Sequence, residues 1–177
     1  MASVPSRVAP NIMIAGTPGT GKSTLAKELA LRTGLSYVNV GEVAEQAECM
    51  DGYDEELQCG ILDEDRVIDE LEDSMSQGGN VLDYHSCEFF PERWFDIVFV
   101  LRTDNAILHS RLTERGYNEK KIENNIESEI FQVILDAAKG AYPEEMVHAL
   151  PSDSADQLES NLDRIQEWIE MWRHQHT

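Results

Sequence analysis

The chain has 177 residues, of which 41% are hydrophobic, and 34 acidic against 14 basic residues give it a formal net charge of −20. This length favours one domain with a substantial core, and the acidity argues against stable direct binding to nucleic acid or to an anionic membrane. No apolar run approaches the ~20 residues of a membrane span, and the three cysteines lack C-x-x-C spacing. We therefore expect no membrane segment and reduced thiols. The acidic excess is either a solvated surface or a docking face for a basic partner.

The first motif along the chain is G-x-x-x-x-G-K-S at Gly16–Ser23, between an apolar run at Ile12–Ala15 and a helical pattern. Glycines let successive backbone N–H groups turn toward one phosphate, and the N-terminus of the following helix faces the same point. Lys22 would then reach the outer phosphates of a nucleoside triphosphate, and the Ser23 hydroxyl would bind Mg²⁺. No Asp or Glu precedes Glu28, which also favours an anion site.

Apolar runs alternate with helical patterns along the chain, which is typical of a parallel sheet flanked by helices. We expect strands at Ile12–Ala15, Ser36–Val40, Val81–Asp83, Ile97–Leu101 and Met146–Leu150, and helices at Lys22–Arg32, Asp63–Ser76, Asn105–Arg115, Lys120–Lys139 and Ala155–Trp172. Residues 41–62 and 115–120 are the least regular segments. The prediction is a three-layer α/β fold whose five-stranded parallel sheet has helices on its faces.

A second signal is Asn80–Asp83, two apolar residues that are followed by an aspartate. An enzyme with a phosphate loop needs a carboxylate near Mg²⁺ at the end of a neighbouring strand, and Asp83 fits this role, although it could also merely cap a turn. His85 lies two residues further, so strand alternation would return its side chain to the side of Asp83. It would either orient the attacking group and shuttle a proton, or support the site through a hydrogen bond.

A third signal is Arg111–Gly116, in which two arginines four residues apart share one helical face before a glycine ends the helix. An arginine at the mouth of a phosphate site can neutralise charge on a transferred phosphoryl group. We expect this role for Arg115 and leave it open for Arg111. The alternative is a surface arginine paired with an acidic neighbour such as Glu114.

The combination of G-x-P-G-x-G-K with R-L-x-x-R resembles the adenylate kinase group of nucleoside monophosphate kinases. Further segments extend the likeness over nearly the whole chain: Asn39–Gly41, Asp51–Glu56, Leu62–Arg66, Asp83–His85, Phe89–Phe95, Leu101–Asp104 and Arg115–Lys121. Together they resemble the adenylate kinase isoenzyme 6 (coilin-interacting nuclear ATPase protein) family.

The resemblance implies one adenylate-kinase-like P-loop domain over residues 1–177, with a nucleotide-monophosphate flap at about 39–62 and a short lid at about 114–124. It implies ATP contacts at Gly19, Gly21, Lys22, Ser23, Thr24 and Arg115, a Walker B pair at Asp83 and His85, and Mg²⁺ at Ser23 and Asp83. The implied activities are phosphoryl transfer from ATP to AMP or dAMP and ATP hydrolysis. The resemblance also implies a nuclear and cytoplasmic location and a role in small ribosomal subunit maturation through a basic ribosomal protein.

The chain departs from the kinase pattern at three places. Ser23 stands where most adenylate kinases have glycine, the lid lacks the additional arginines of long-lid kinases, and Glu45 stands where a basic residue would hold the monophosphate. A carboxylate there would repel AMP unless a cation such as Arg66 compensates. Two functions therefore stay open: a nucleoside monophosphate kinase, or mainly an ATPase assembly factor whose nucleotide state controls binding of a basic ribosomal protein.

Overall fold

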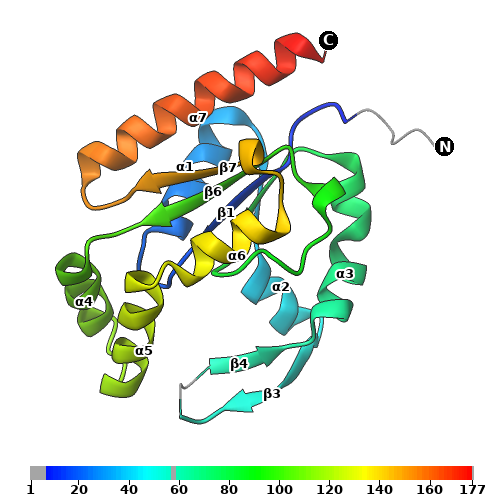
Figure 1. The fold of residues 1–177 in the computed structure, drawn as a ribbon. Coiled ribbons are helices and arrows are strands. Elements are labelled where there is room, and N and C mark those ends of the chain that lie inside the picture. Colours follow the sequence, from blue (N-terminus) through cyan, green and yellow to red (C-terminus); the bar gives the residue numbers. More distant parts are fainter. Residues whose placement is uncertain (1–6, 57–58, 177) are drawn as a thin grey trace.

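A five-stranded parallel sheet forms the centre of the molecule (Figure 1). The computed structural model describes residues 7–56 and 59–176. The strand order is β2-β5-β1-β6-β7, and the strands are β1 Ile12–Gly16, β2 Ser36–Asn39, β5 Asn80–Asp83, β6 Ile97–Arg102 and β7 Val147–Pro151. The predicted α/β fold and its five-stranded parallel sheet are confirmed. The inner strands β1 and β6 are buried on both faces, which explains why the sequence shows them as continuous apolar runs.

Alternation along β1 divides the core into two halves. Ile12 and Ile14 pack against α1 (Lys22–Thr33) and α7 (Ala155–Gln175), while Met13 and Ala15 face the opposite side of the sheet. That second side is covered by α2 (Val40–Gln46), α3 (Glu64–Gln77) and α6 (Val133–Ala141). Figure 1 shows α6 and α7 on opposite sides of the sheet, which makes three layers.

The helix expected at Lys120–Lys139 is wrong, because the chain forms two helices there. These are α5 (Glu119–Ile130) and α6, and between them Gln132 adopts a left-handed conformation with φ of 56°. The two helices bury their apolar faces against different neighbours. α5 packs on α4 (Asn105–Glu114), whereas α6 packs on the sheet, so one straight helix could not serve both.

The segment 41–62, which we expected to be the least regular, contains a helix and a hairpin. Asn39 caps α2 by accepting a hydrogen bond from the Glu42 N–H at 3.0 Å, so Val40 begins a helix instead of ending a strand. β3 (Met50–Asp54) and β4 (Cys59–Leu62) then pair antiparallel. Two short 3₁₀ helices, η1 (Glu92–Trp94) and η2 (Glu144–Met146), complete the described elements.

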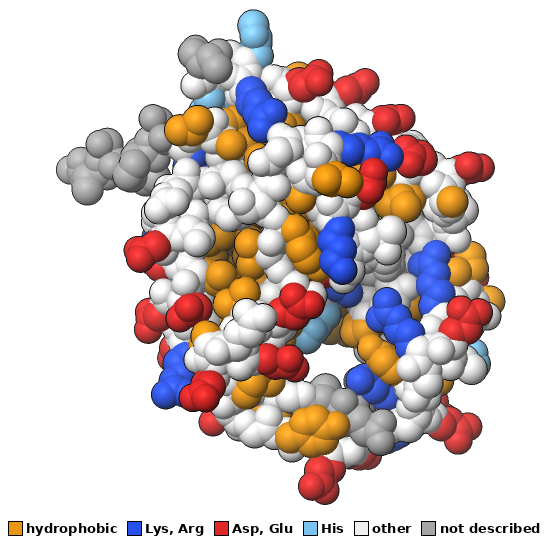
Figure 2. Space-filling view, turned by 180° about the vertical axis from the view of Figure 1, so that it is seen from behind, with side chains coloured by type: hydrophobic (Ala, Val, Ile, Leu, Met, Phe, Trp, Pro, Cys, Tyr) orange, Lys and Arg blue, Asp and Glu red, His pale blue; other side chains and the backbone are white. Residues whose placement is uncertain are grey.

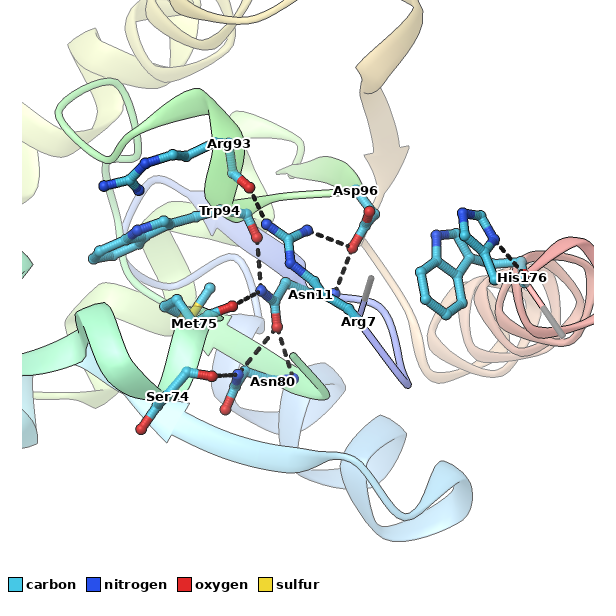
Figure 3. Close-up of polar contacts among 10 residues, drawn as sticks. Arg7, Asn11, Ser74, Met75, Asn80, Arg93, Trp94, Asp96 and His176 are labelled. Carbon is cyan, nitrogen blue, oxygen red and sulfur yellow. Dashed lines mark hydrogen bonds and ion pairs between the residues drawn. The ribbon is translucent and has the colours of Figure 1, made fainter. Parts of the chain in front are cut away.

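The amino end of the sheet is held by a buried polar network around Asn11 (Figure 3). Its side-chain amide donates to the carbonyls of Met75 and Trp94 at 2.8 and 2.7 Å, and its oxygen accepts from the backbone and side chain of Asn80. Asp96 accepts from the Asn11 backbone N–H and from Arg7. All the hydrogen-bonding groups of the Asn11 side chain are thus satisfied, and the network fixes the scaffold at the edge opposite the phosphate loop.

In the described ranges no helix combines the length and apolar character that crossing a membrane requires. Cys49 and Cys87 are free and buried, and burial raises the pKa of the Cys87 thiol to about 12. Cys87 therefore stays a protonated thiol at neutral pH.

Candidate active site

The phosphate loop joins β1 to α1 at the carboxyl edge of the sheet, where ligands bind in open α/β folds. Gly16, Gly19 and Gly21 all have positive φ values, between 91° and 152°. A Cβ atom at Gly16 would lie 2.7 Å from Thr20 Oγ1, and one at Gly19 would lie 2.9 Å from Leu108 Cδ1. The loop therefore requires glycine at these two positions for both conformation and space.

Side chains from the opposite wall fix the loop backbone. Arg111 donates to the carbonyl oxygens of Gly19 and Ser152 at 3.2 and 2.9 Å, and Ser152 Oγ donates to the Thr20 carbonyl at 2.5 Å. Thr20 Oγ1 donates to the Thr17 carbonyl at 2.8 Å. The sequence left the role of Arg111 open. In the structure its guanidinium hydrogen-bonds to the backbone of the phosphate loop and of the segment at Ser152, so it stabilises the loop conformation.

Lys22 begins α1, and its ammonium donates to the Thr17 carbonyl at 3.3 Å. Burial lowers the pKa of Lys22 to about 8, and the nearby Arg115 lowers it further, while the carboxylates of Asp83 and Glu129 oppose the shift. A cation that is desolvated and next to another cation favours an anionic ligand strongly. This is the electrostatic signature of a phosphate site.

Ser23 and Asp83 come together as predicted, because β1 pairs with β5 and places Asp83 beside Ile14, near the first turn of α1. Ser23 Oγ donates to Asp83 Oδ2 at 2.6 Å. A hydroxyl and a carboxylate are hard oxygen donors of the kind that Mg²⁺ takes in combination with substrate phosphates. Among the described residues no group of three or more His, Cys, Asp or Glu is placed to hold a metal ion.

His85 lies near this pair for a different reason than strand alternation, since β5 ends at Asp83. Tyr84 N–H donates to the Ile14 carbonyl and Gly16 N–H donates to the His85 carbonyl, so the chain bends across the end of β1. The His85 side chain lines a cavity of about 350 Å³ with Pro18, Lys121 and other residues. Burial and the charge of Lys22 lower the pKa of His85 to about 4, although the residue keeps a surface that is exposed to solvent. Its imidazole is therefore neutral at pH 7.

Arg115 ends α4 and lines a second cavity, of about 390 Å³. The same cavity is lined by Gly19, Gly21 and Thr24. The fold therefore brings this arginine to the phosphate loop from a segment about 90 residues away in the chain, and four of the six predicted ATP contacts line this cavity.

Two polar residues of the site were missed at the sequence level. Tyr37 donates its hydroxyl to Asp83 Oδ2 at 2.6 Å. The buried Glu129 accepts from Arg102 Nε and the Thr103 N–H, both at 3.0 Å, and from Thr17 Oγ1 at 3.4 Å. In a chain with 34 acidic residues, nothing in the local sequence distinguishes Glu129 as a buried one. Tyr37 lies on β2, which pairs with the strand of Asp83, and this neighbouring strand could have indicated it.

Helix α2, which lies in the segment expected to form the flap, carries no lysine or arginine that could bind a phosphate. Glu45 is exposed there, and Arg66, which we considered as a compensating cation, donates to the Glu48 carbonyl at 3.2 Å and lies 3.8 Å from the Asp63 carboxylate. At the hairpin tip, Glu56 accepts from Asn118 through its carbonyl at 3.5 Å and pairs with Lys120 at 3.7 Å. The segments expected to form the flap and the lid thus touch, and Figure 2 shows an opening through the lower half of the molecule with basic side chains along one side.

Comparison with known proteins agrees with this geometry. Residues 12–132 match the family model described as an AAA domain. Adenylate kinase isoenzyme 6 homologs from Dictyostelium discoideum and Caenorhabditis elegans are 52% and 42% identical to the chain, over 92% and 100% of it and over 93% and 98% of their own lengths.

Among solved structures, the shikimate kinases of Bacteroides thetaiotaomicron and Acinetobacter baumannii superpose with TM-scores of 0.60 and 0.64 at 17% and 15% identity. The matches cover 91% and 92% of this chain and 98% and 94% of theirs, and at such identity they show the shared fold alone. With relatives matched over nearly their whole length, the chain belongs to the family of adenylate kinase isoenzyme 6 homologs.

Proposed function

We propose that the protein is a Mg²⁺-dependent nucleoside monophosphate kinase that transfers the γ-phosphoryl group of ATP to AMP or dAMP, with accompanying ATP hydrolysis. The observation that carries this proposal is the convergence of Lys22, the Ser23–Asp83 pair and Arg115 on one glycine-rich loop. The relatives are adenylate kinase isoenzyme 6 homologs, and that name indicates the same reaction class.

Phosphoryl transfer needs positioning and charge stabilisation more than covalent chemistry. Mg²⁺, when bound with ATP by Ser23 and Asp83, would neutralise charge on the β- and γ-phosphates. Lys22 and Arg115 would stabilise the transferred group from two sides. The neutral imidazole of His85 would orient the acceptor oxygen, or a water molecule in hydrolysis, and can accept a proton there.

The flap supports a nucleotide acceptor. Helix α2 and the β3–β4 hairpin extend from the same edge of the sheet as the phosphate loop, and the hairpin tip contacts the start of α5. A space enclosed in this way can hold a second nucleotide opposite the ATP and limit the access of water, which favours transfer over hydrolysis.

The test is product analysis with Mg-ATP in the presence and absence of AMP. A kinase forms two ADP for each ATP consumed when AMP is present, with little free phosphate. Phosphate release that AMP leaves unchanged would refute the kinase proposal. Lys22→Ala is expected to abolish both activities, and His85→Ala to reduce both. Intact rates in His85→Ala would remove the proposed role of His85.

A second candidate is an ATPase assembly factor whose nucleotide state controls binding of a basic small-subunit ribosomal protein, in the nucleus and cytoplasm. The exposed Glu45 in the flap and the net charge of −20 favour it, because they weaken an anionic acceptor and attract a cationic partner. Binding to such a protein should weaken as salt rises. Binding that is indifferent to salt would argue against an acidic docking face.

A further inference from the structure

The outer side of the lid carries a groove that the proposed chemistry does not use. Helices α4 and α5 lie side by side at the margin of the molecule (Figure 1) and border a cavity of about 590 Å³. Its apolar wall follows α5 at one-turn intervals through Ile122, Ile126 and Ile130, and His109 lines it from α4. Ile122 is buried against α4, whereas Ile130 is 51% exposed. The groove thus has an apolar floor that opens to solvent toward the end of α5.

Apolar exposure continues beyond the groove. Phe131 and Val133, at the junction of α5 and α6, are 66% and 50% exposed. Phe131 follows Ile130 directly in the chain, and Val133 follows after Gln132. Single exposed apolar residues are ordinary, but a contiguous group beside a groove marks an interaction site.

A row of carboxylates borders this apolar row. Glu119, Glu123 and Glu127 repeat at one-turn intervals on α5 and line the same groove. All three are exposed, and within the described ranges none of them forms an ion pair with Lys or Arg. At the α4 end of the groove, Lys121 instead lies over the ring of Tyr117 at 4.0 Å. The rim at Glu123 and Glu127 is therefore negative and available for a cation.

We propose that this groove binds a basic amphipathic helix of a partner protein. An amphipathic helix in a groove places apolar anchors at i, i+3, i+4 and i+7 on the floor, and its lysine or arginine face would lie on the Glu123–Glu127 rim. The twelve residues of α5 offer about 18 Å of matching surface, or three turns. Because α5 begins four residues after Arg115, a bound helix would also rest on the lid beside the ATP site.

This inference rests on the proposed binding of a basic partner and is independent of phosphoryl transfer. The probe is a fluorescently labelled synthetic helix of about five turns, with leucine along one face and lysine on the other. A control peptide has the same composition with both residues spread around the helix. Anisotropy titrations with the full-length protein measure each Kd at two or more salt concentrations.

We expect the amphipathic peptide to bind at least about tenfold more tightly than the control peptide. The double variant Glu123→Lys/Glu127→Lys should weaken its binding about tenfold and flatten the salt dependence. Ile130→Ser should weaken binding about threefold at any salt concentration. The matched control Glu167→Lys/Glu170→Lys makes the same charge change on exposed positions of α7 and should stay within about twofold of the wild type.

Equal weakening by the α7 and α5 variants would overturn the proposal, because it would show attraction to the overall charge. Equal binding of the two peptides would overturn it as well. If the α5 variant still bound a basic ribosomal protein with normal, salt-sensitive affinity, the partner proposal would stand and the groove assignment would fall. Circular dichroism confirms that the variants are folded, as expected for changes at exposed positions.

Discussion

Lys22→Met should stabilise the nucleotide-free protein while it removes ATP binding. The ammonium of Lys22 is desolvated beside Arg115, which lowers its pKa from 10.5 to about 8. In the unfolded chain water solvates this charge freely. At pH 7 the burial of the charge in the folded protein therefore lowers the free energy of unfolding. Methionine keeps the long apolar stem and removes the charge. The Thr17 carbonyl stays satisfied, because the Thr20 N–H and hydroxyl both donate to it, at 3.2 and 2.8 Å.

The magnitude follows from the pKa shift. At about 1.36 kcal/mol per pKa unit the shift corresponds to ~3.4 kcal/mol. Lys22 keeps part of its surface in contact with solvent, so we take roughly half of that value. The variant also loses the 3.3 Å hydrogen bond from Lys22 to Thr17, which reduces the expected stabilisation by about 0.5–1 kcal/mol. A net gain of about 1 kcal/mol should raise Tm by about 2–4 °C.

Thermal unfolding with and without Mg-ATP tests this. Without nucleotide the variant should melt above the wild type, and with Mg-ATP only the wild type should gain stability. Since the folded pKa is depressed, the wild type gains stability as pH rises from about 8 toward 10.5, so the advantage of the variant should shrink there. Lys139→Met, at an exposed position of α6, should change Tm little. A nucleotide-free Lys22→Met protein that is folded but melts below the wild type would refute the reasoning.

Three further predictions concern residues around the phosphate loop. Tyr37→Phe removes a donor to Asp83, the carboxylate proposed to bind Mg²⁺, and should raise the Mg²⁺ concentration for half-maximal activity about tenfold. An equal effect of Tyr53→Phe, at a residue 59% exposed on the hairpin, would contradict it. Glu129→Gln deprives Arg102 of its buried charged partner and should cost about 2 kcal/mol in unfolding free energy, so an unchanged denaturant midpoint would count against it. In the nucleotide-free protein the imidazole resonances of His85 should titrate near pH 4, and titration near the ordinary pKa of 6.5 would show that the ring is not desolvated.

Local patterns were enough to predict the scaffold. Each of the five parallel strands lies within one or two residues of its expected position. The central strands β1 and β6 were the clearest, because a strand buried on both faces needs an uninterrupted apolar run. The phosphate loop was equally readable, since Gly16 and Gly19 are required by backbone conformation and close contacts. The pairing of Ser23 with Asp83 followed from the placement of two strand ends at one edge of a parallel sheet.

Other features depend on contacts between segments far apart in the chain. The break at Gln132 arises because α5 and α6 pack against different neighbours, and no local breaker residue announces it. The β3–β4 hairpin was missed because residues 41–62 lack a clear period-two pattern.

The sequence by itself determined the phosphate loop, the meeting of Ser23 with Asp83 and the succession of strands along the chain, because local backbone preference and burial encode each of them. Only the tertiary structure decided which distant side chains serve that loop. It assigned Arg111 to the loop backbone, buried Glu129 beside Thr17, and joined Tyr37 to Asp83. Such partners are chosen by the packing of α4, α5 and β2 around the sheet edge, and a charged residue does not reveal from its neighbours in the chain which partner it will meet.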